Sequence, residues 1–507
     1  MPKKRKIESK QDNFQKQSPV EVIVEDVTSH PLCLHGPTLL FSTEKGRYYA
    51  CASCRNKECT VHIDEEDWQK ENVRKRNEKY YSLIPKIDKA AAWENFSEVK
   101  SCHATDRAYC NTCEELYIVS KSKKHGKDHR IVTPLTDDQL NRPASWLPTL
   151  ENDSVEAQYM FTKKSVSTVF GILKNNNISN ILCIGTPSVH EEAQSRPDFN
   201  SLLLDYDKRH HLFQPPAKYI WYNMFNNYMF NGNQDEKVLK KFFKNSRDGG
   251  ICIVMDPPFG GRVEPLVYTL KELTATYRKV CDNPSDDLMP VLWAFPYFSE
   301  PYITNMAPEI KIHDYQIEYT NHKKFQNKFK DGRKFVSPIR FFTNLPLVTI
   351  DMSNDKNYKL CNKCKYWVAS TNNHCYKCKD CTSKNGTTYV HCDVCKRCVK
   401  PTFFHCKECG RCSQRKNHVC GTVVESQSCF NCREKGHKKS ECPQLQNSAG
   451  ARRRSAPPRA PPARARPRAP PPSASSAPAA AAPGSGAAPR AGNQFDTLHN
   501  HADITIS

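Results

Sequence analysis

The fold of the central part of this 507-residue chain is decided by two apolar stretches, Asn180-Ile181-Leu182-Cys183-Ile184-Gly185-Thr186-Pro187 and Gly250-Ile251-Cys252-Ile253-Val254-Met255-Asp256. Each is a short, uninterrupted apolar run, which is typical of a strand buried on both faces of a sheet. Five further stretches are candidate strands: 201–205, 219–223, 292–297, 315–319 and 339–343. A helix with Ser154 as its N-cap is indicated by apolar residues at Val166, Val169, Phe170 and Leu173. This alternation predicts an α/β domain with a mostly parallel sheet over residues 145–350.

The ends of these strands indicate a ligand site, because ligands of such sheets bind beyond the carboxyl ends of the strands. Gly185 and Thr186 end the first strand, and Gly185 allows a ligand to approach the backbone closely. An ordinary tight turn is the alternative. Asp205 ends the next strand, where a carboxylate accepts hydrogen bonds from ribose hydroxyls. The pair fits NAD or S-adenosylmethionine, and the missing glycines of G-x-G-x-x-G disfavour a pyrophosphate ligand.

The fourth strand runs into Asp256-Pro257-Pro258-Phe259. Elsewhere this would be a proline-rich turn, but at the carboxyl end of a sheet strand it suits transfer of a methyl group to adenine. The exocyclic amine of adenine is a poor nucleophile, because its lone pair is delocalised into the ring. The Asp256 carboxylate and the Pro257 carbonyl can accept its two hydrogens and turn the lone pair towards a methyl donor. Pro257 and Pro258 fix the backbone, and Phe259 offers a ring for an extruded base.

This motif resembles the (Asp/Asn)-Pro-Pro-(Phe/Tyr/Trp) signature of amino-directed N-methyltransferases. The resemblance implies a Rossmann-like class I methyltransferase sheet and S-adenosylmethionine as the cofactor. The segment Gln158-Tyr159-Met160-Phe161 is similar to the aromatic segment that closes over the methionine end of the cofactor in that family. Ordinary helix core is the alternative for these residues. Asn223, at the end of the third strand, is a candidate contact for an adenine ring.

The composition indicates a polyanionic partner and bound metal. The formal net charge is +21, and the chain has 25 cysteines. No apolar run approaches the ~18 residues of a membrane helix, and no signal peptide is evident, so we expect no membrane association. In a reducing compartment, clustered Cys and His are metal ligands rather than disulfides.

Two sparse clusters precede the central domain. Cys33, His35, Cys51 and Cys59 surround a Gly46-Arg47-Tyr48 core and resemble a GRF-type zinc finger at 30–75, a nucleic-acid-binding module; Cys54 competes with Cys59 as fourth ligand. Residues 100–135 carry a Cys2His2-type set that is one residue short of the usual spacing: Cys110, Cys113, His125 and His129. Four nitrogen and sulfur ligands suit tetrahedral zinc.

A dense array at 358–422 repeats His-Cys-x2-Cys-x2-Cys and resembles the cysteine-rich domain of Asp-His-His-Cys palmitoyltransferases, without their catalytic tetrapeptide. We expect structural zinc, at most four ions, in small metal-stapled knuckles, with a ligand pairing that the sequence leaves open. The candidate ligands are Cys361, Cys364, His374, Cys375, Cys378, Cys381, His391, Cys392, Cys395, Cys398, His405, Cys406, Cys409, Cys412, His418 and Cys420. At 427–444, a CCHC zinc knuckle is formed by Cys429, Cys432, His437 and Cys442, and such knuckles bind single-stranded nucleic acid.

The two ends of the chain differ from the rest. Residues 1–29 are predicted to be a disordered basic terminus, in which Pro2-Lys3-Lys4-Arg5-Lys6 is a candidate nuclear-localisation signal. Residues 445–507 form a tail rich in Arg, Pro and Ala that we also expect to be disordered.

The order of these modules is similar to that of the zinc-finger, CCHC-containing ribosomal-RNA adenosine N6-methyltransferases of animals. The resemblance implies methylation of one adenosine in large-subunit rRNA, zinc modules that bind and orient the RNA, and residence in the nucleus, nucleolus and cytoplasm. Two other functions stay open: amino-methylation of DNA or of protein glutamine, and a non-catalytic zinc-finger adaptor that binds RNA.

Overall fold

The computed structural model describes residues 20–53, 59–122, 124–126, 128–150, 158–322, 337–414 and 420. Several predictions lie outside these residues, including the basic N-terminal run, the Arg/Pro/Ala tail, Cys54, Ser154, His418 and the whole CCHC knuckle (Cys429, Cys432, His437 and Cys442). Among the described helices, none combines the length and the apolar character that a membrane span requires.

The first module is a small antiparallel sheet with the strand order β1-β4-β5-β6. Its strands are β1 (Glu21–Ile23), β4 (Leu39–Thr43), β5 (Gly46–Ala50) and β6 (His62–Asp64). A hairpin of β2 (Leu32–Cys33) and β3 (Gly36–Pro37) precedes β4, and the helices α1 (Glu65–Trp68), α2 (Glu71–Asn77) and α3 (Lys79–Leu83) follow β6. Residues 20–29 were predicted to belong to a disordered terminus, but they contain β1 and a 3-10 turn because Val22 and Val27 pack into this module.

The second module packs two helices on a three-stranded antiparallel sheet of order β8-β7-β9. Its elements are α4 (Lys89–Ser101), β7 (Arg107–Cys110), β8 (Glu115–Ile118), β9 (Ile131–Val132) and α5 (Asp137–Asn141). Asp88 caps α4 by accepting hydrogen bonds from the amides of Ala90 and Ala91. His125 and His129 lie between β8 and β9 and not on a helix, so this module is not a ββα finger.

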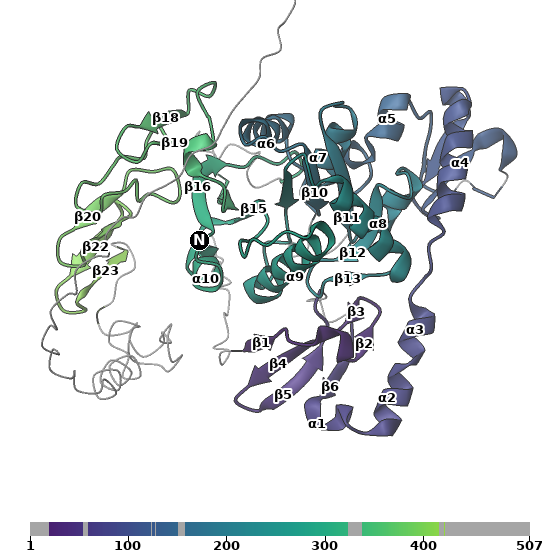
Figure 1. Cartoon of the computed structure of the whole chain (residues 1–507), viewed down its shortest axis with the longest axis horizontal. Helices are drawn as coiled ribbons and strands as arrows, with labels where there is room; N and C mark the ends of the chain where they lie inside the picture. The colour runs from purple at the N-terminus through teal and green to yellow at the C-terminus, as the bar shows by residue number, and fades with distance from the viewer. Residues whose placement is uncertain are drawn as a thin grey trace, which may run out of the picture. The chain divides into compact units, whose positions relative to one another are not determined.

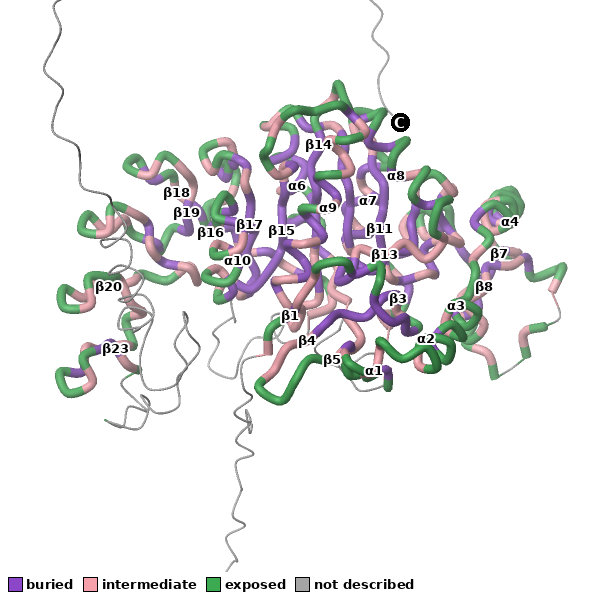
Figure 2. Tube along the Cα trace, turned by 60° about the horizontal axis from the view of Figure 1, so that its bottom comes forward, coloured by how far each residue is buried: buried purple, intermediate pink, exposed green. Residues whose placement is uncertain are grey.

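The central domain is built on an eight-stranded mixed sheet of order β13-β12-β11-β10-β14-β15-β17-β16 (Figure 1). The five neighbouring strands β12, β11, β10, β14 and β15 run parallel. The pairs β12–β13, β15–β17 and β16–β17 are antiparallel. The strands are β10 (Asn180–Ile184), β11 (Asn200–Asp205), β12 (Tyr219–Asn223), β13 (Tyr228–Met229), β14 (Ile251–Met255), β15 (Val291–Pro296), β16 (Lys311–Gln316) and β17 (Ile339–Thr343). Figure 2 shows that buried residues concentrate in these strands.

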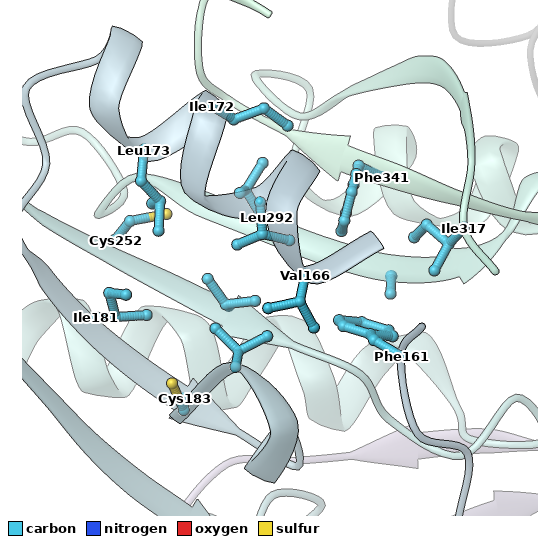
Figure 3. Packing of buried hydrophobic residues seen from close by; sticks show 14 of the residues in the cluster. Phe161, Val166, Ile172, Leu173, Ile181, Cys183, Cys252, Leu292, Ile317 and Phe341 are labelled. Carbon is cyan, nitrogen blue, oxygen red and sulfur yellow. The ribbon is translucent and has the colours of Figure 1, made fainter. Parts of the chain in front are cut away.

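Helices cover both faces of the sheet, which explains the uninterrupted apolar strands. They are α6 (Lys163–Asn175), α7 (Pro187–Gln194), α8 (Asn233–Asn245), α9 (Val263–Cys281) and α10 (Glu300–Met306). On one face, α6 and α7 pack on side chains such as Ile181, Cys183 and Leu292, as Figure 3 shows for α6. On the other face, α8, α9 and α10 pack on residues such as Leu182 and Ile253.

Two local predictions for this domain need correction. The helix expected from Ser154 begins at Lys163, because Thr162 is its N-cap and accepts a hydrogen bond from the Ser165 amide. The strand expected at 315–319 is β16, which begins four residues earlier. The middle of this strand is formed by His313 and Asp314, which are buried, and their polar side chains hid the strand from a reading based on apolar runs.

The cysteine-rich array consists of three described two-stranded hairpins. They pair β18 (Tyr358–Cys361) with β19 (Tyr366–Ala369), β20 (Val390–Cys392) with β21 (Arg397–Val399), and β22 (Phe403–Cys406) with β23 (Arg411–Gln414). Each hairpin turns at a Cys-x2-Cys pair, and the residue after the second cysteine has a positive φ: Lys365, Lys396 and Gly410. The knuckles therefore share one turn geometry.

Candidate active site and metal clusters

A cavity of about 310 Å³ opens at the carboxyl ends of the parallel strands. Its walls contain most of the residues predicted to hold a cofactor or to act in catalysis: Gln158, Tyr159, Gly185, Asp205, Asn223, Asp256, Pro257, Pro258 and Phe259. These residues come from segments that are up to about a hundred positions apart, and the parallel strand order brings them to one edge. The volume is within the range of ~300–1,000 Å³ that is usual for small-molecule sites.

Any residue other than glycine would strain the backbone at position 185. Its φ is +63°, and a Cβ atom there would lie 2.9 Å from the Met224 methyl group and 3.2 Å from the Asp256 carbonyl oxygen. The ends of β10 and β14 are thus in close contact, and no side chain separates the Gly185 backbone from the cavity. This position has the open backbone that a ligand can approach.

Asp205 is the buried carboxyl group at the end of β11. Burial raises its pKa to about 6, and the nearby Asp207 carboxylate adds to this effect, while His210 and Arg209 oppose it. One of its oxygens accepts a hydrogen bond from the Asp207 amide at 2.8 Å. Asp207 itself is held by Arg209, whose hydrogen bonds and charge outweigh burial and lower the pKa of Asp207.

Asp256 is half-buried directly after the end of β14 and is held by a residue from the other side of the site. The Tyr319 hydroxyl donates a hydrogen bond of 3.0 Å to the Asp256 carboxylate. Burial raises the pKa of Asp256 well above its usual value, and the hydrogen bond from Tyr319 opposes this shift. The result is a fixed carboxyl group with unusual affinity for a proton.

Aromatic rings surround this carboxyl group. The rings of Tyr159 and Phe259 stack with centroids 5.3 Å apart, and Tyr159 also stacks on His322 at 4.4 Å. Tyr319 packs edge-on against Phe259. Phe259, which was predicted to stack on a base, therefore has an aromatic partner in Tyr159.

Three predicted cofactor contacts have other roles in the structure. Phe161 is buried in the core and packs on Tyr319, so it does not line the cavity. Thr186 is also absent from the cavity walls, because its hydroxyl turns inward and donates to the Val254 carbonyl. Asn223 lines the cavity, but its amide nitrogen donates to the His35 carbonyl and to the Ser53 hydroxyl, which leaves no amide hydrogen for an adenine ring.

Gln158 lines the cavity through a bridging role that the sequence did not indicate. Its side-chain oxygen accepts from the Leu150 amide, and its nitrogen donates to Asp207 at 3.2 Å. Sequence reasoning gave no role in the site to Tyr319 or Ser53, and it assigned His35 only to the first metal cluster. No local signal places these residues at the cavity, because each reaches it from a segment distant in the sequence.

The predicted metal ligands gather into sets of four. Cys33, His35, Cys51 and Cys59 form the first, and Cys110, Cys113, His125 and His129 form the second, with all ligand atoms of a set within 4.8 Å of one another. Cys59 thus joins the first set. In the second, Nε2 of His125 lies 3.6 Å from a carboxylate oxygen of Glu115.

In the array the ligand sets interleave, so a repeat unit is not a knuckle by itself. The sets are Cys361, Cys364, His374 and Cys381; Cys375, Cys378, His391 and Cys398; and Cys392, Cys395, His405 and Cys412. Each His-Cys-x2-Cys-x2-Cys unit gives its first and last residues to one set and its two middle cysteines to the next. Cys406 lies 3.5 Å from Cys420, and Cys409 also adjoins Cys420.

The spacing of these ligand atoms fits a tetrahedral ion. Metal–ligand distances of ~2.3 Å for sulfur and ~2.0 Å for nitrogen require sulfur atoms ~3.8 Å apart and sulfur–nitrogen pairs ~3.5 Å apart. Cys364 and Cys381 are separated by 3.8 Å, as are Cys378 and Cys398. Cys110 and Cys113 each lie 3.4 Å from His129.

Comparison with known proteins assigns the central domain to a class. A family model described as "Probable N6-adenine methyltransferase" matches residues 152–345, and a "Zinc knuckle" model matches residues 427–444. The central domain, which contains Asp256, is therefore an N6-adenine methyltransferase domain. The second match covers the four ligands predicted for the CCHC knuckle.

Curated relatives extend the similarity to most of the chain. The rRNA N(6)-adenosine-methyltransferase ZCCHC4 of Homo sapiens is 36% identical over 436 residues, which covers 83% of this chain and 84% of the human protein. The Xenopus laevis protein of the same name is 39% identical over 448 residues, 85% of this chain and 89% of its own length. The chain belongs to this family of rRNA N6-adenosine methyltransferases, as the order of its motifs predicted.

Proposed function

We propose that this chain transfers a methyl group from S-adenosylmethionine to N6 of an adenosine in RNA, and that the RNA is that of the large ribosomal subunit. One observation carries the proposal: Asp256-Pro257-Pro258-Phe259 shares a single cavity with Gly185 and Asp205. The names of the curated relatives support rRNA as the substrate.

The residues of the cavity suit the cofactor. When bound, S-adenosylmethionine supplies a methyl group on a positively charged sulfur. Asp205 would accept hydrogen bonds from its ribose hydroxyls, and the bare backbone at Gly185 would admit it to the strand ends. The strand order β12-β11-β10-β14-β15 supports a Rossmann-like class I sheet, in which ligands bind at this edge.

Asp256 and the Pro257 carbonyl would hold the two hydrogens of the adenine amine. As the new carbon–nitrogen bond forms, the methyl–sulfur bond of the donor would break and its electron pair would stay on the sulfur. The nitrogen must also lose one hydrogen as a proton, which the Asp256 carboxylate would accept. The raised pKa of Asp256 favours this role, because it makes the carboxylate a better proton acceptor. Tyr319 positions the carboxylate through its hydrogen bond.

The metal clusters would hold zinc, whose preference for thiolate and imidazole ligands in a tetrahedron they match. We propose that these modules and the CCHC knuckle grip the RNA, in keeping with the net charge of +21. The basic run Pro2–Lys6 supports a nuclear and nucleolar location, with a cytoplasmic pool as the family resemblance implies.

The test uses the full chain, methyl-labelled S-adenosylmethionine, and three acceptors: large-subunit rRNA, duplex DNA and a glutamine peptide. We expect label in N6-methyladenosine of the rRNA alone. Asp256→Ala should lower the rate at least about 100-fold, the usual effect of removing a group that stabilises the transition state. Asp248→Ala is the matched control, because this exposed residue precedes the opposite end of the same strand. Labelling of the DNA or the peptide instead, or an undiminished rate in Asp256→Ala, would refute the proposal.

A further inference from the structure

The cofactor cavity is not made by the central domain alone. His35 and Ser53 of the first module form part of its wall beside Asn223 and Asp205. Ser53 lies 170 positions from Asn223 in the sequence, and its hydroxyl accepts a hydrogen bond from the Asn223 side chain. The His35 ring lies over Tyr206, another wall residue, with centroids 6.1 Å apart.

Two buried asparagines of the central domain hold this part of the wall. Asn223 and Asn226 both donate to the His35 carbonyl oxygen, at 2.8 and 3.1 Å. Asn226 also donates to the Pro37 carbonyl at 2.7 Å. Both side chains are nearly inaccessible, with 2% and 4% of their surface exposed. Buried amides of this kind need their partners, so the hairpin and the cavity wall form one unit.

The fit between hairpin and central domain is close. Gly36 has a φ of +91°, and a Cβ atom there would lie 2.5 Å from the Tyr228 ring. Only glycine allows the β2–β3 hairpin to come this near to β13.

The hairpin is fixed by the first ligand set. His35 is one of the four ligands, and Ser53 follows the ligand Cys51 by two residues. The strands β2 and β3 have two residues each, which is too little pairing to hold a shape alone. The ion that Cys33, His35, Cys51 and Cys59 would share therefore sets the position of the wall.

We infer that the metal ion of the first module is required for tight binding of S-adenosylmethionine, because this module supplies a wall of the cofactor cavity. The inference rests on the proposed function of that cavity. It gives the module a role in cofactor binding, separate from any contact with RNA.

Two variants test the inference by isothermal titration calorimetry with S-adenosylmethionine and by zinc analysis. Cys33→Ser removes a ligand outside the cavity wall and should lower the zinc content by one ion and weaken cofactor binding at least tenfold. Asn226→Ala retains the metal but frees the hairpin, and should weaken binding about fivefold at full zinc content. Circular dichroism checks that the central domain of each variant is still folded.

Matched controls use the same substitutions away from the first module. Cys102→Ser changes a thiol that belongs to none of the ligand sets in the described residues and donates to the Glu98 carbonyl. Asn95→Ala removes a comparable amide–carbonyl bond, to Leu116 in the second module. Both should bind the cofactor within about twofold of the wild type. Unchanged affinity in Cys33→Ser and Asn226→Ala overturns the inference, whereas failure of the wild type to bind S-adenosylmethionine overturns the proposed function.

Discussion

The central sheet and the cysteine-rich array are stabilised in different ways. The sheet carries two large clusters of buried apolar side chains, one on each face. The described array has one small buried cluster of its own, which consists of Cys361, Val368 and Cys381, and its first hairpin adds Tyr358 and Ala369 to the cluster on one face of the sheet. The sheet therefore folds by burying apolar surface, whereas the array has hairpin strands of three or four residues and little apolar core, so we expect its fold to depend on bound metal ions.

The interleaved ligand sets make this difference sharper. Cys375 and Cys378 belong to one set, while His374 and Cys381, on either side of them, belong to the preceding one. A perturbed site must therefore disturb its neighbour, because the same turn supplies both. In the sheet, many apolar contacts remain when one side chain is replaced. In the array, loss of one metal site also disturbs the neighbouring site.

The largest expected effect is that of Cys378→Ser. A structural zinc ion contributes ~10–16 kcal/mol to the folding of a small module, far more than any single apolar side chain. We expect the variant to lose at least one zinc ion and to lose hydrogen-exchange protection across residues 358–414. Protection of strands β10, β11 and β14 should stay unchanged.

Mass spectrometry of the native protein and hydrogen exchange measure both outcomes. Cys183→Ser is the control for the sheet. It makes the same substitution at a buried thiol that belongs to none of the ligand sets in the described residues. It should weaken the sheet and leave the zinc content intact. A Cys378→Ser protein with full zinc content and a protected array would show that the array does not depend on its metal.

Local patterns in the sequence were sufficient to predict those elements whose residues are close together along the chain. The strand ends at Gly185, Asp205 and Asp256 could be located because apolar runs and the residues that end them are adjacent. The candidate ligands were found for the same reason, since Cys-x2-Cys spacing is a property of a single turn. Ligand pairing was not, because each middle pair of cysteines directly follows one histidine in the sequence but shares a ligand set with the next histidine along the chain.

Contacts between distant segments could not be predicted. Asn223 seemed free to meet an adenine ring, yet its amide hydrogens are taken by His35 and Ser53. Tyr319 lies 63 positions from Asp256 and reaches it only through the antiparallel edge of the sheet. Such contacts depend on how whole elements pack, which no short pattern records.

A smaller effect, confined to the sheet, is expected for Gly185→Ala. The left-handed backbone costs a residue with a Cβ atom ~1–2 kcal/mol, and the new methyl group would press on the Asp256 carbonyl. We expect the melting temperature of the central domain to fall by about 2–8 °C and cofactor affinity to fall with it. Metal content should not change, in contrast to Cys378→Ser.

Gly171→Ala is the matched control for this substitution. Gly171 lies within α6, and nothing stands within 4 Å of the place that a Cβ atom would take. Alanine in a helix interior is favoured over glycine by ~0.5–1 kcal/mol, so this variant should be slightly more stable than the wild type. Equal melting temperatures for Gly185→Ala and Gly171→Ala would contradict the claim that the backbone at Gly185 requires glycine.

The smallest effect concerns charge, in which the two regions also differ. The array buries none of its described acidic side chains, Asp380, Asp393 and Glu408, whereas the sheet buries Asp205 at the end of β11. Because the folded protein raises the pKa of Asp205 to about 6, this group favours folding at low pH and loses that contribution as the pH rises through 6.

Cofactor binding should depend on pH in the opposite sense. A ribose diol donates hydrogen bonds, so it prefers the ionised carboxylate, and the affinity for S-adenosylmethionine should fall as the pH drops below 6, approaching tenfold per unit. Calorimetric titrations at pH 5, 6 and 7 measure the slope. Asp205→Asn cannot ionise and should bind more weakly at pH 7 with a flatter profile. If the wild type and Asp205→Asn gave parallel profiles, another group would govern the pH dependence, and Asp205 would have no part in recognising the ribose.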